Sequence, residues 1–228
     1  MDTPLGGSPA SRVAIVTGGS RGIGRAVVGV LASRGYAVVV DYLHDRRCAE
    51  STVETVLASN ALAVAVRADV ADDLDVERLF AETIEAFGAV DVVVHTVTGR
   101  ACATSVSDSD LVEFEALCRI NTRGTFLVNR EAARRLRDGG SIINLTSSTV
   151  ATAAPGYGVD ATTSAAVEAL TRVLALELRE RDITVNAVSL DVDLACAPDR
   201  VAEVVTSLLG DGHGSTGEVI SIDQGRSA

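Results

Sequence analysis

The stretch "RVAIVTGGSRGIG", from Arg12 to Gly24, decides the fold. It begins with a short run of Val, Ile and Ala, which is typical of a strand buried on both faces of a sheet. Glycines then follow, and after them comes a segment of helical period that ends at Gly35. A strand that turns directly into a helix presents unsatisfied N–H groups and the positive end of the helix dipole at that turn. The stretch therefore predicts a strand–turn–helix unit with a phosphate-binding turn.

Three glycines in this turn have separate physical tasks. Gly18 allows the tight turn, Gly22 lets the backbone approach a pyrophosphate, and Gly24 permits close packing of the helix on the strand. A glycine turn that binds nothing is the alternative, but the position between a strand and a helix favours a dinucleotide ligand. The residues of the turn predicted to contact the cofactor are Gly18, Ser20, Arg21, Gly22, Ile23 and Gly24.

Short Val- and Ile-rich runs alternate with helical segments along the rest of the chain. This order predicts an α/β fold with a doubly wound, seven-stranded parallel sheet and helices on both of its faces. The long helix near the middle of the chain is expected to begin at about Asp108, with Ser107 or Asp108 as its N-cap. The predicted strands cover 12–18, 36–42, 62–70, 90–97, 140–148, 182–190 and 218–223. The predicted helices cover 21–35, 48–60, 74–88, 108–136, 149–178 and 199–210.

Length and composition indicate one soluble domain. We expect residues 1–11 to form a flexible leader and residues 12–228 a single dinucleotide-binding domain. The leader lacks the regions of a signal peptide, and no apolar run is long enough to cross a bilayer, so we predict a cytoplasmic protein. The net charge of −11 argues against nucleic acids and anionic membranes as partners.

The chain contains no lysine, since all 20 basic residues are arginine. No mechanism that needs a catalytic lysine can therefore operate in it. The four cysteines are scattered without a C-x-x-C pair, and the three histidines are not at metal-ligand spacings. We predict free thiols and no metal site.

The spacing T-G-x-x-x-G-x-G in the turn resembles that of the short-chain dehydrogenase/reductase family, and within it the 3-oxoacyl-carrier-protein reductases. The resemblance runs from Arg12 to Gly225. It implies a Rossmann sheet in the order 3-2-1-4-5-6-7. It also implies an adenine-binding pair at Asp69 and Val70, although an N-cap role for Asp69 is the alternative reading. His95 takes the first position of the family's N-N-A-G segment and is included with the cofactor residues.

The cofactor preference depends on the end of the second strand. The family position whose acid binds the ribose of NAD is Tyr42 here, and Asp41 precedes it, so alternation along the strand points Asp41 to the other face unless the strand end twists. Arg21 lies where NADP-preferring members often carry a base, and Arg46 and Arg47 follow shortly after. We predict NADP(H), with NAD(H) as the alternative. The plainer reading has Asp41 capping a turn and Arg21 as a solvated charge.

The resemblance fails at the catalytic helix. Members of the family use a Y-x-x-x-K pair, in which Tyr donates the proton and Lys lowers its pKa; in register, this chain has Asp160 and Ser164. Tyr157 lies three residues before the family's tyrosine position, and we expect it in the loop that precedes the helix. Asn121 and Ser147 match the remaining two family positions. The candidate catalytic residues are Ser147, Asn121, Asp160 and Tyr157.

Two further features of the family are missing on the catalytic side of the site. The family's P-G after the sixth strand is Leu190-Asp191, and the substrate lid is nearly deleted, so that "DVDLACAPDR" connects the sixth strand to the last helix. We predict an open pocket beside a complete cofactor site.

Three functions are compatible with a complete cofactor site beside an incomplete catalytic site. The first is an atypical NADP(H)-dependent ketoreductase, in which Ser147 polarises the carbonyl and a bulky, phenolic, polyketide-like substrate brings its own proton. In other versions of this hypothesis the proton comes from Asp160 or Tyr157, or through His95 as a relay. The second is a non-catalytic, dinucleotide-binding partner subunit. The third is a redox-neutral cyclase or dehydratase with Asp160 as acid and base. The resemblance also implies a homodimer or homotetramer formed through the long helix and the catalytic helix.

Overall fold

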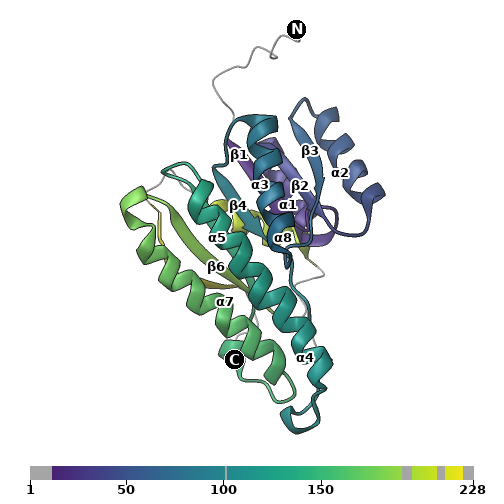
Figure 1. The fold of residues 1–228 in the computed structure, drawn as a ribbon, viewed down its shortest axis with the longest axis vertical. Coiled ribbons are helices and arrows are strands. Elements are labelled where there is room, and N and C mark those ends of the chain that lie inside the picture. The colour runs from purple at the N-terminus through teal and green to yellow at the C-terminus, as the bar shows by residue number, and fades with distance from the viewer. Residues whose placement is uncertain (1–11, 101, 192–196, 210–213, 223–228) are drawn as a thin grey trace.

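One parallel sheet organises the protein (Figure 1). The structure, a computed structural model, describes residues 12–100, 102–191, 197–209 and 214–222; the predicted leader 1–11 lies outside them. The strand order is β3-β2-β1-β4-β5-β6-β7, which confirms the predicted doubly wound topology. The strands are β1 (Val13–Thr17), β2 (Ala37–Tyr42), β3 (Ala63–Arg67), β4 (Val92–His95), β5 (Ser141–Ser147), β6 (Thr184–Leu190) and β7 (Val219–Ile222).

Helices cover both faces of the sheet. One layer contains α1, α2 and α8, and the other contains α3, α5 and α7. No helix of the described residues is long and apolar enough to cross a membrane. The helices are α1 (Gly22–Ser33), α2 (Arg46–Ala58), α3 (Asp73–Phe87), α4 (Leu111–Leu117), α5 (Thr125–Arg135), α6 (Thr149–Thr152), α7 (Gly158–Glu177) and α8 (Pro198–Ser207).

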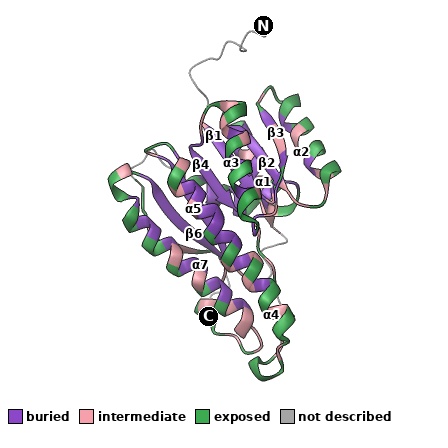
Figure 2. Ribbon diagram, in the orientation of Figure 1, coloured by how far each residue is buried: buried purple, intermediate pink, exposed green. Residues whose placement is uncertain are grey.

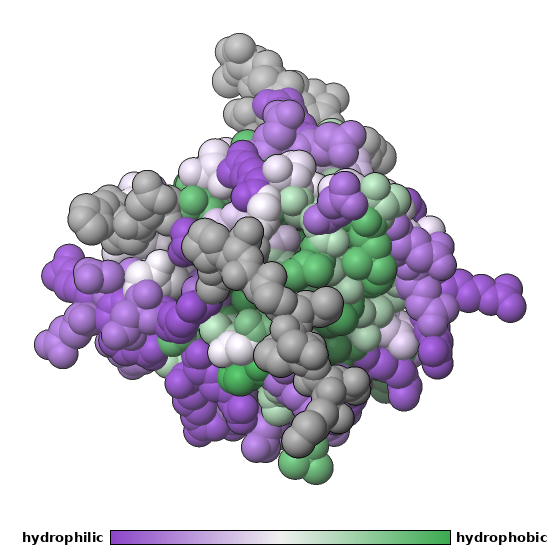
Figure 3. Space-filling view, turned by 90° about the horizontal axis from the view of Figure 1, so that it is seen from above, coloured by the Kyte–Doolittle hydropathy of each residue, from purple (hydrophilic) through white to green (hydrophobic). Residues whose placement is uncertain are grey.

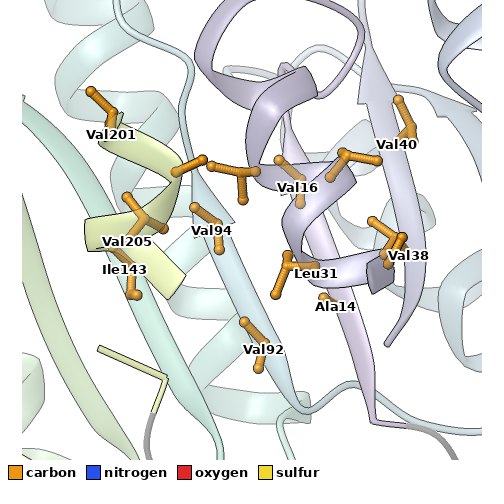
Figure 4. Packing of buried hydrophobic residues seen from close by; sticks show 14 of the residues in the cluster. Ala14, Val16, Leu31, Val38, Val40, Val92, Val94, Ile143, Val201 and Val205 are labelled. Atoms are coloured by element: carbon orange, nitrogen blue, oxygen red, sulfur yellow. The ribbon is translucent and has the colours of Figure 1, made fainter. Parts of the chain in front are cut away.

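Alternate residues of each strand enter different hydrophobic cores. In β1, Ala14 and Val16 pack with α1 and α8, whereas Ile15 packs with the helices of the other layer. Figure 4 shows the first of these cores, where Leu31 of α1 and Val205 of α8 meet the sheet from the same side. A strand that buries both faces must be apolar at successive positions, which explains the unbroken Val and Ile runs of the sequence.

The outer surfaces of the helices are mainly polar, with exposed apolar exceptions such as Phe126 of α5 and Leu176 of α7. Figure 2 shows buried residues along the inner side of each helix and exposed residues along the outer side. In the view from above, hydrophilic residues form most of the periphery and apolar residues gather nearer the centre (Figure 3). This arrangement is expected for amphipathic helices around a central sheet.

The long middle helix differs from its prediction. It begins at Leu111 and not near Asp108, and its N-cap is Asp110, whose carboxylate accepts the Val112 N–H at 3.0 Å. The predicted N-cap region forms a separate 3-10 turn, in which the Ser105 hydroxyl donates to Asp108 at 2.6 Å. A π-helical segment η2, Cys118–Gly124, then separates α4 from α5.

The segment 149–178 is also not one continuous helix. It contains the short α6 and the long α7, separated by a turn in which Ala153 and Gly156 have φ of 46° and 86°. A left-handed residue ends a helix, and Pro155 within the same turn lacks an N–H with which to continue it. Residues Gly158 to Glu177 then form the predicted catalytic helix in register.

Candidate active site

A cavity of about 620 Å³ lies where β1 and β4 end. This is the point at which the strand order reverses, and doubly wound sheets bind ligands there. Its volume is in the range of small-molecule and cofactor pockets. The predicted cofactor residues that line it are Gly18, Ser20, Arg21, Ile23, Gly24, Asp41, Tyr42, Asp69 and Val70.

The glycine turn contains two glycines with a left-handed backbone and one glycine that is closely packed. Gly18 has φ of 64°, and a Cβ on it would lie 3.0 Å from Val97 Cγ2. A Cβ on Gly24 would lie only 2.2 Å from the carbonyl oxygen of Gly18, so helix and turn approach too closely for any side chain. Gly22 has φ of 54°, yet a Cβ there would meet nothing within 4 Å. Gly22 is not among the described residues that line the cofactor cavity, contrary to its prediction; it borders a neighbouring hollow with Arg25 and Pro198.

The first turn of α1 is available to an anion. Arg21 is its N-cap residue and has an extended backbone, and its side chain makes no capping hydrogen bond. Ser20 is buried and Arg21 is exposed at the cavity. The free N–H groups of a helix start, together with a guanidinium beside them, suit the phosphates of a dinucleotide.

Asp41 and Tyr42 both reach the cavity, although they are neighbours on one strand. Tyr42 packs partly against the α1 side of the sheet. Asp41 is 1% exposed, and its Oδ2 accepts the Gly18 N–H at 3.2 Å. The main chain of Asp41 also accepts the Gly19 N–H at 2.9 Å. The carboxyl is therefore not turned away from the site, because it lies under the glycine turn.

Asp69 lines the same cavity and follows β3, the strand that pairs with β2. Its Oδ1 accepts the Ala71 N–H at 2.9 Å, and its Oδ2 lies 2.6 Å from Nη2 of Arg119. Partial burial opposes ionisation, but the bonds from Arg119 and from the Ala71 N–H lower the pKa of Asp69 below its usual value. The N-cap of α3 is Asp72, so the alternative N-cap role for Asp69 is wrong. Sequence reasoning missed Arg119, because its pairing with Asp69 joins segments far apart in the chain.

The other two arginines considered for a cofactor phosphate differ from Arg21. Arg46 pairs with Glu50 one turn later at 2.7 Å. Arg47 is exposed on the same turn of α2. Neither is among the described residues that line the cavity, so Arg21 is the arginine of the three that borders it.

His95 lies beneath the cavity and not on its wall. It is fully buried, and its Nδ1 is 2.9 Å from Oγ1 of Thr17. The same threonine oxygen accepts the Thr96 N–H at 3.0 Å. Burial lowers the pKa of His95 to about 4, so the ring is neutral at pH 7. The structure thus gives His95 a place in the strand junction, while Thr96 and Val97 line the cavity.

A second, smaller cavity of about 80 Å³ continues from the first toward α7. The two share Ile23 and Thr98 in their walls, so an elongated cofactor could extend from one to the other. Three of the four predicted catalytic residues line it, and so does the residue at the family's lysine position. These four are Asn121, Ser147, Asp160 and Ser164.

Ser147 ends β5 and keeps a hydroxyl proton to donate. Its Oγ lies 3.2 Å from Oγ1 of Thr149, which donates to it, and 3.4 Å from the Thr149 N–H. As an acceptor in both contacts, Ser147 can direct its own O–H toward a carbonyl oxygen in the cavity.

Asn121 connects three parts of the site. Its Oδ1 accepts the Gly99 N–H at 2.6 Å, and its Nδ2 donates to the Gly99 carbonyl at 3.0 Å and to Thr163 Oγ1 at 3.1 Å. The side-chain amide is thereby occupied by the loop after β4 and by α7. In this structure the Asn121 amide links the loop after β4 to α7.

Asp160 and Ser164 are on the inner face of α7, at 3% and 6% exposed. Both residues thus lie one turn apart in the wall of the small cavity. Tyr157 lies just before α7 and forms a bridge with Thr104, where the Thr104 N–H donates to Gly156 at 2.8 Å. Tyr157 is not among the described residues that line the small cavity, so the structure does not bring it to the site.

Arg100 and Asp191 also line the small cavity and were not predicted as site residues. Arg100 follows β4 and carries a positive charge into a site that lacks the family's lysine. Its position at the end of a strand was the available signal, because the ends of parallel strands meet at one edge. The shortened lid falls between β6 and α8, and residues 192–196 lie outside the described part of the chain.

Comparisons with known proteins agree with this geometry. Residues 18–192 match the family model described as enoyl-(acyl carrier protein) reductase. The chain is 41% identical over 180 residues to versicolorin reductase 1 of Aspergillus parasiticus, covering 78% of this chain and 68% of that protein. It is 37% identical over 190 residues to tetrahydroxynaphthalene reductase of Pyricularia oryzae, covering 82% and 67%.

A solved structure extends the likeness to a bound cofactor. A short-chain dehydrogenase from Burkholderia cenocepacia in complex with NADP has a TM-score of 0.84 and 31% identity, covering 95% of this chain and 97% of that chain. The predictions of an oxidoreductase family and of a dinucleotide cofactor are confirmed. The chain belongs to the short-chain dehydrogenase/reductase family of oxidoreductases.

Proposed function

We propose that this chain is an NADP(H)-dependent ketoreductase that works without the family's Tyr and Lys, on a phenolic, polyketide-like ketone. One observation carries the proposal: a ligand-sized cofactor cavity leads into a small cavity where Ser147 remains and Asp160 and Ser164 replace the usual pair. The names of two relatives support the substrate class, since both are reductases and tetrahydroxynaphthalene is itself a polyhydroxylated aromatic compound.

The residues present fit the cofactor. The glycine turn at Gly18, the helix start at Arg21 and the wall at Asp41 would hold the phosphates and the adenosine. A bound NADPH would supply the hydride. Arg21, at the rim of the cavity, favours a 2′-phosphate over a bare ribose, and this is the basis for preferring NADP(H) to NAD(H).

Ser147 has the central role on the substrate side. Its O–H donates to the carbonyl oxygen, and the hydroxyl of Thr149 donates to Ser147 and makes that proton more acidic. Arg100 borders the same space, where its positive charge stabilises the alkoxide that forms as the carbonyl is reduced.

The substrate itself supplies the proton that completes the reduction. Hydride adds to the carbonyl carbon, the oxygen becomes an alkoxide, and a phenol beside it gives up a proton to form the alcohol and a phenolate. A phenol has an ordinary pKa of about 10, and an alkoxide is far more basic, so this transfer is downhill. No protein acid is needed.

The decisive experiment compares two substrates that differ by one methyl group. A hydroxynaphthalene-type ketone with a free phenol beside the carbonyl should oxidise NADPH at least about tenfold faster than its O-methyl ether. The Ser147→Ala variant should lower kcat for the phenol by roughly 10- to 100-fold. Equal rates for phenol and ether, lost together in Asp160→Asn, would assign the acid to Asp160 and overturn substrate assistance.

Nucleotide-binding measurements test the part of the proposal that concerns the cofactor. NADPH should bind more tightly than NADH, and Arg21→Ala should remove most of that difference. Absence of binding for both nucleotides would refute the ketoreductase and leave the non-catalytic partner subunit or the redox-neutral function.

The proposal includes a homodimer or homotetramer in the cytoplasm. Apolar side chains are exposed on the two helices expected to pair: Phe126 of α5 is 50% exposed, and Val173 and Leu176 of α7 are 53% and 69% exposed. Such residues are more stable when covered by a second copy. Light scattering should give at least twice the mass of one chain, and a monomeric mass would contradict the assembly.

A further inference from the structure

The π-helical segment η2 contributes to the walls of both cavities. Arg119 and Ile120 line the large cofactor cavity, and the next residue, Asn121, lines the small cavity. The segment joins α4 to α5, and these helices lie beside α7 in Figure 1. Turns of π-helix inside α-helices are rare and occur frequently at functional sites. A small movement of η2 would therefore change the shape of both cavities.

On the side of the large cavity, η2 is attached to the turn that follows β3. Arg119 Nη2 lies 2.6 Å from Asp69 Oδ2, and Arg123 Nε donates to the carbonyl of Ala71 at 2.9 Å. Arg119 and Asp69 are both among the described residues that line the cavity, whereas Arg123 and Ala71 are not. A ligand in the large cavity can therefore meet the ion pair directly.

The ion pair of Arg119 and Asp69 is open to water. The Arg119 side chain is 51% exposed and the Asp69 side chain is 22% exposed. Exposed ion pairs hold their side chains weakly, because water and salt screen the charges. A ligand that covers the pair excludes water and strengthens the attraction between the two charges. Removal of that water weakens the ligand's own affinity, but it leaves Arg119 held more firmly.

On the side of the small cavity, η2 is attached through Asn121. Its Oδ1 accepts the Gly99 N–H at 2.6 Å, and its Nδ2 donates to Thr163 Oγ1 at 3.1 Å. Gly99 and Asn121 line this cavity together with Ser147. Asn121 is two residues from Arg119 along the chain, so a restraint on Arg119 also restricts the position of the Asn121 amide.

We infer that Arg119 is a positioning residue that couples the two cavities: when the adenosine end of a dinucleotide covers its ion pair with Asp69, Arg119 fixes η2 and with it the Asn121 amide. The inference rests on the proposed function, because it requires that the large cavity bind the adenosine end. Arg119 acts through Asn121, since it is not among the described residues that line the small cavity. A segment that one ligand has already ordered loses less conformational freedom when the next ligand binds.

The experiment uses adenosine 2′,5′-bisphosphate, which is the adenosine end of NADP(H) without the nicotinamide. Hydrogen exchange followed by NMR reports on the Gly99 N–H, which donates to Asn121. At saturation with the probe, this amide of the natural protein should exchange about fivefold more slowly or better, the lower end of typical coupling between sites. In Arg119→Gln, also at saturation, the slowing should be less than about twofold. Equal slowing in the two proteins, or none in the natural protein, overturns the inference.

Two further variants separate the ion pair from a general loss of packing. Arg119→Lys keeps a positive charge for the single contact with Asp69 and should retain most of the slowing. Arg130→Gln is the matched control, because Arg130 of α5 pairs with Asp73 of α3 and is not among the described residues that line either cavity. It should retain the full slowing. Loss of the slowing in either variant contradicts a specific role for Arg119.

Binding of reduced nicotinamide mononucleotide, which lacks the adenosine end, gives a second measurement. Adenosine 2′,5′-bisphosphate should lower its Kd by about fivefold or more in the natural protein and by less than about twofold in Arg119→Gln. Failure of adenosine 2′,5′-bisphosphate and NADPH to bind the natural protein is a different result, because it refutes the proposed function itself. Binding of the two half-cofactors without any effect on each other refutes only the role of Arg119.

Discussion

The side-chain amide of Asn121 hydrogen-bonds both main-chain groups of Gly99, with Oδ1 accepting its N–H at 2.6 Å and Nδ2 donating to its carbonyl at 3.0 Å. A third bond, to Thr163, joins this pair to α7. The loop after β4, the π-helical segment and the catalytic helix are therefore held together at one amide. Asn121 lies within the π-helical segment η2 and is buried, so its amide faces the loop and α7.

Asn121→Ala should lower the free energy of unfolding by about 2–3 kcal/mol, because three hydrogen bonds are lost and buried polar groups remain without partners. Asn121→Asp keeps the acceptor for Gly99 and should cost less than Asn121→Ala at low pH, where the carboxyl is protonated. Urea denaturation at pH 4 and pH 7 measures both. An Asn121→Ala variant as stable as the natural protein would show that the amide does not hold the loop after β4.

Two glycines of the same turn should respond differently to alanine. Gly24→Ala places a Cβ 2.2 Å from a carbonyl oxygen and should destabilise the fold by several kcal/mol, since the backbone must move. Gly22→Ala meets no atom and should cost about 1–2 kcal/mol for its positive φ. Gly22 is not among the described residues that line the cofactor cavity, so Gly22→Ala should retain NADPH binding, whereas Gly24→Ala changes a residue of the cavity wall and should lose it. Thermal melting and NADPH titration of both variants test the contrast, and loss of NADPH binding in Gly22→Ala alone would contradict it.

Restoring the family's Tyr and Lys should allow the protein to reduce ketones that carry no phenol. The double variant Asp160→Tyr with Ser164→Lys places both groups on the inner face of α7. We expect reduction of a ketone without a phenol to increase at least about tenfold, as proton donors typically contribute. The single Asp160→Tyr variant is the matched control. No gain in the double variant, despite intact NADPH binding, would indicate that the small cavity excludes simple ketones.

We expect His95 to lower the free energy of unfolding at acid pH. Its folded-state pKa is about 4 against an ordinary value near 6.5, so below pH 6.5 the unfolded chain binds a proton that the folded chain does not. Stability is lost as pH falls from 6.5 to 4, by roughly 3 kcal/mol in total. Denaturation of the natural protein and of His95→Asn at matched pH isolates this contribution. Parallel curves for the two proteins would show that His95 titrates normally.

Asp41 should act in the opposite direction in the free protein. The unfolded carboxyl ionises near pH 4, whereas the folded one keeps its proton to about 7, so folding becomes less favourable as pH rises between those values. The difference relative to Asp41→Asn should reach roughly 4 kcal/mol by pH 7. Melting curves at pH 4.5, 6 and 7.5 without cofactor test it. Equal pH dependence in both proteins would indicate that water or a rearranged turn reaches the buried oxygen.

Local patterns in the sequence were enough for most of the fold. Alternation of short apolar runs with helical segments predicted the seven strands, because a strand buried on both faces must be apolar throughout. One exception was a helix start: the chain from 105 to 110 offers several acids and serines, and the fold selects Asp110 as the cap. The others were breaks inside two predicted helices, at the π-helical segment η2 and between α6 and α7.

The sequence by itself determined the glycine turn, the register of the catalytic helix and the loss of its Tyr and Lys, because each depends on residue type and spacing within one segment. Only the tertiary structure decided which side chains meet. It placed Asp41 beneath Gly18, joined Arg119 to Asp69 and brought Arg100 to the cavity of Ser147. Those outcomes depend on burial and on contacts between distant segments, and it is burial that gives a carboxyl or an imidazole a different charge from the one its sequence suggests.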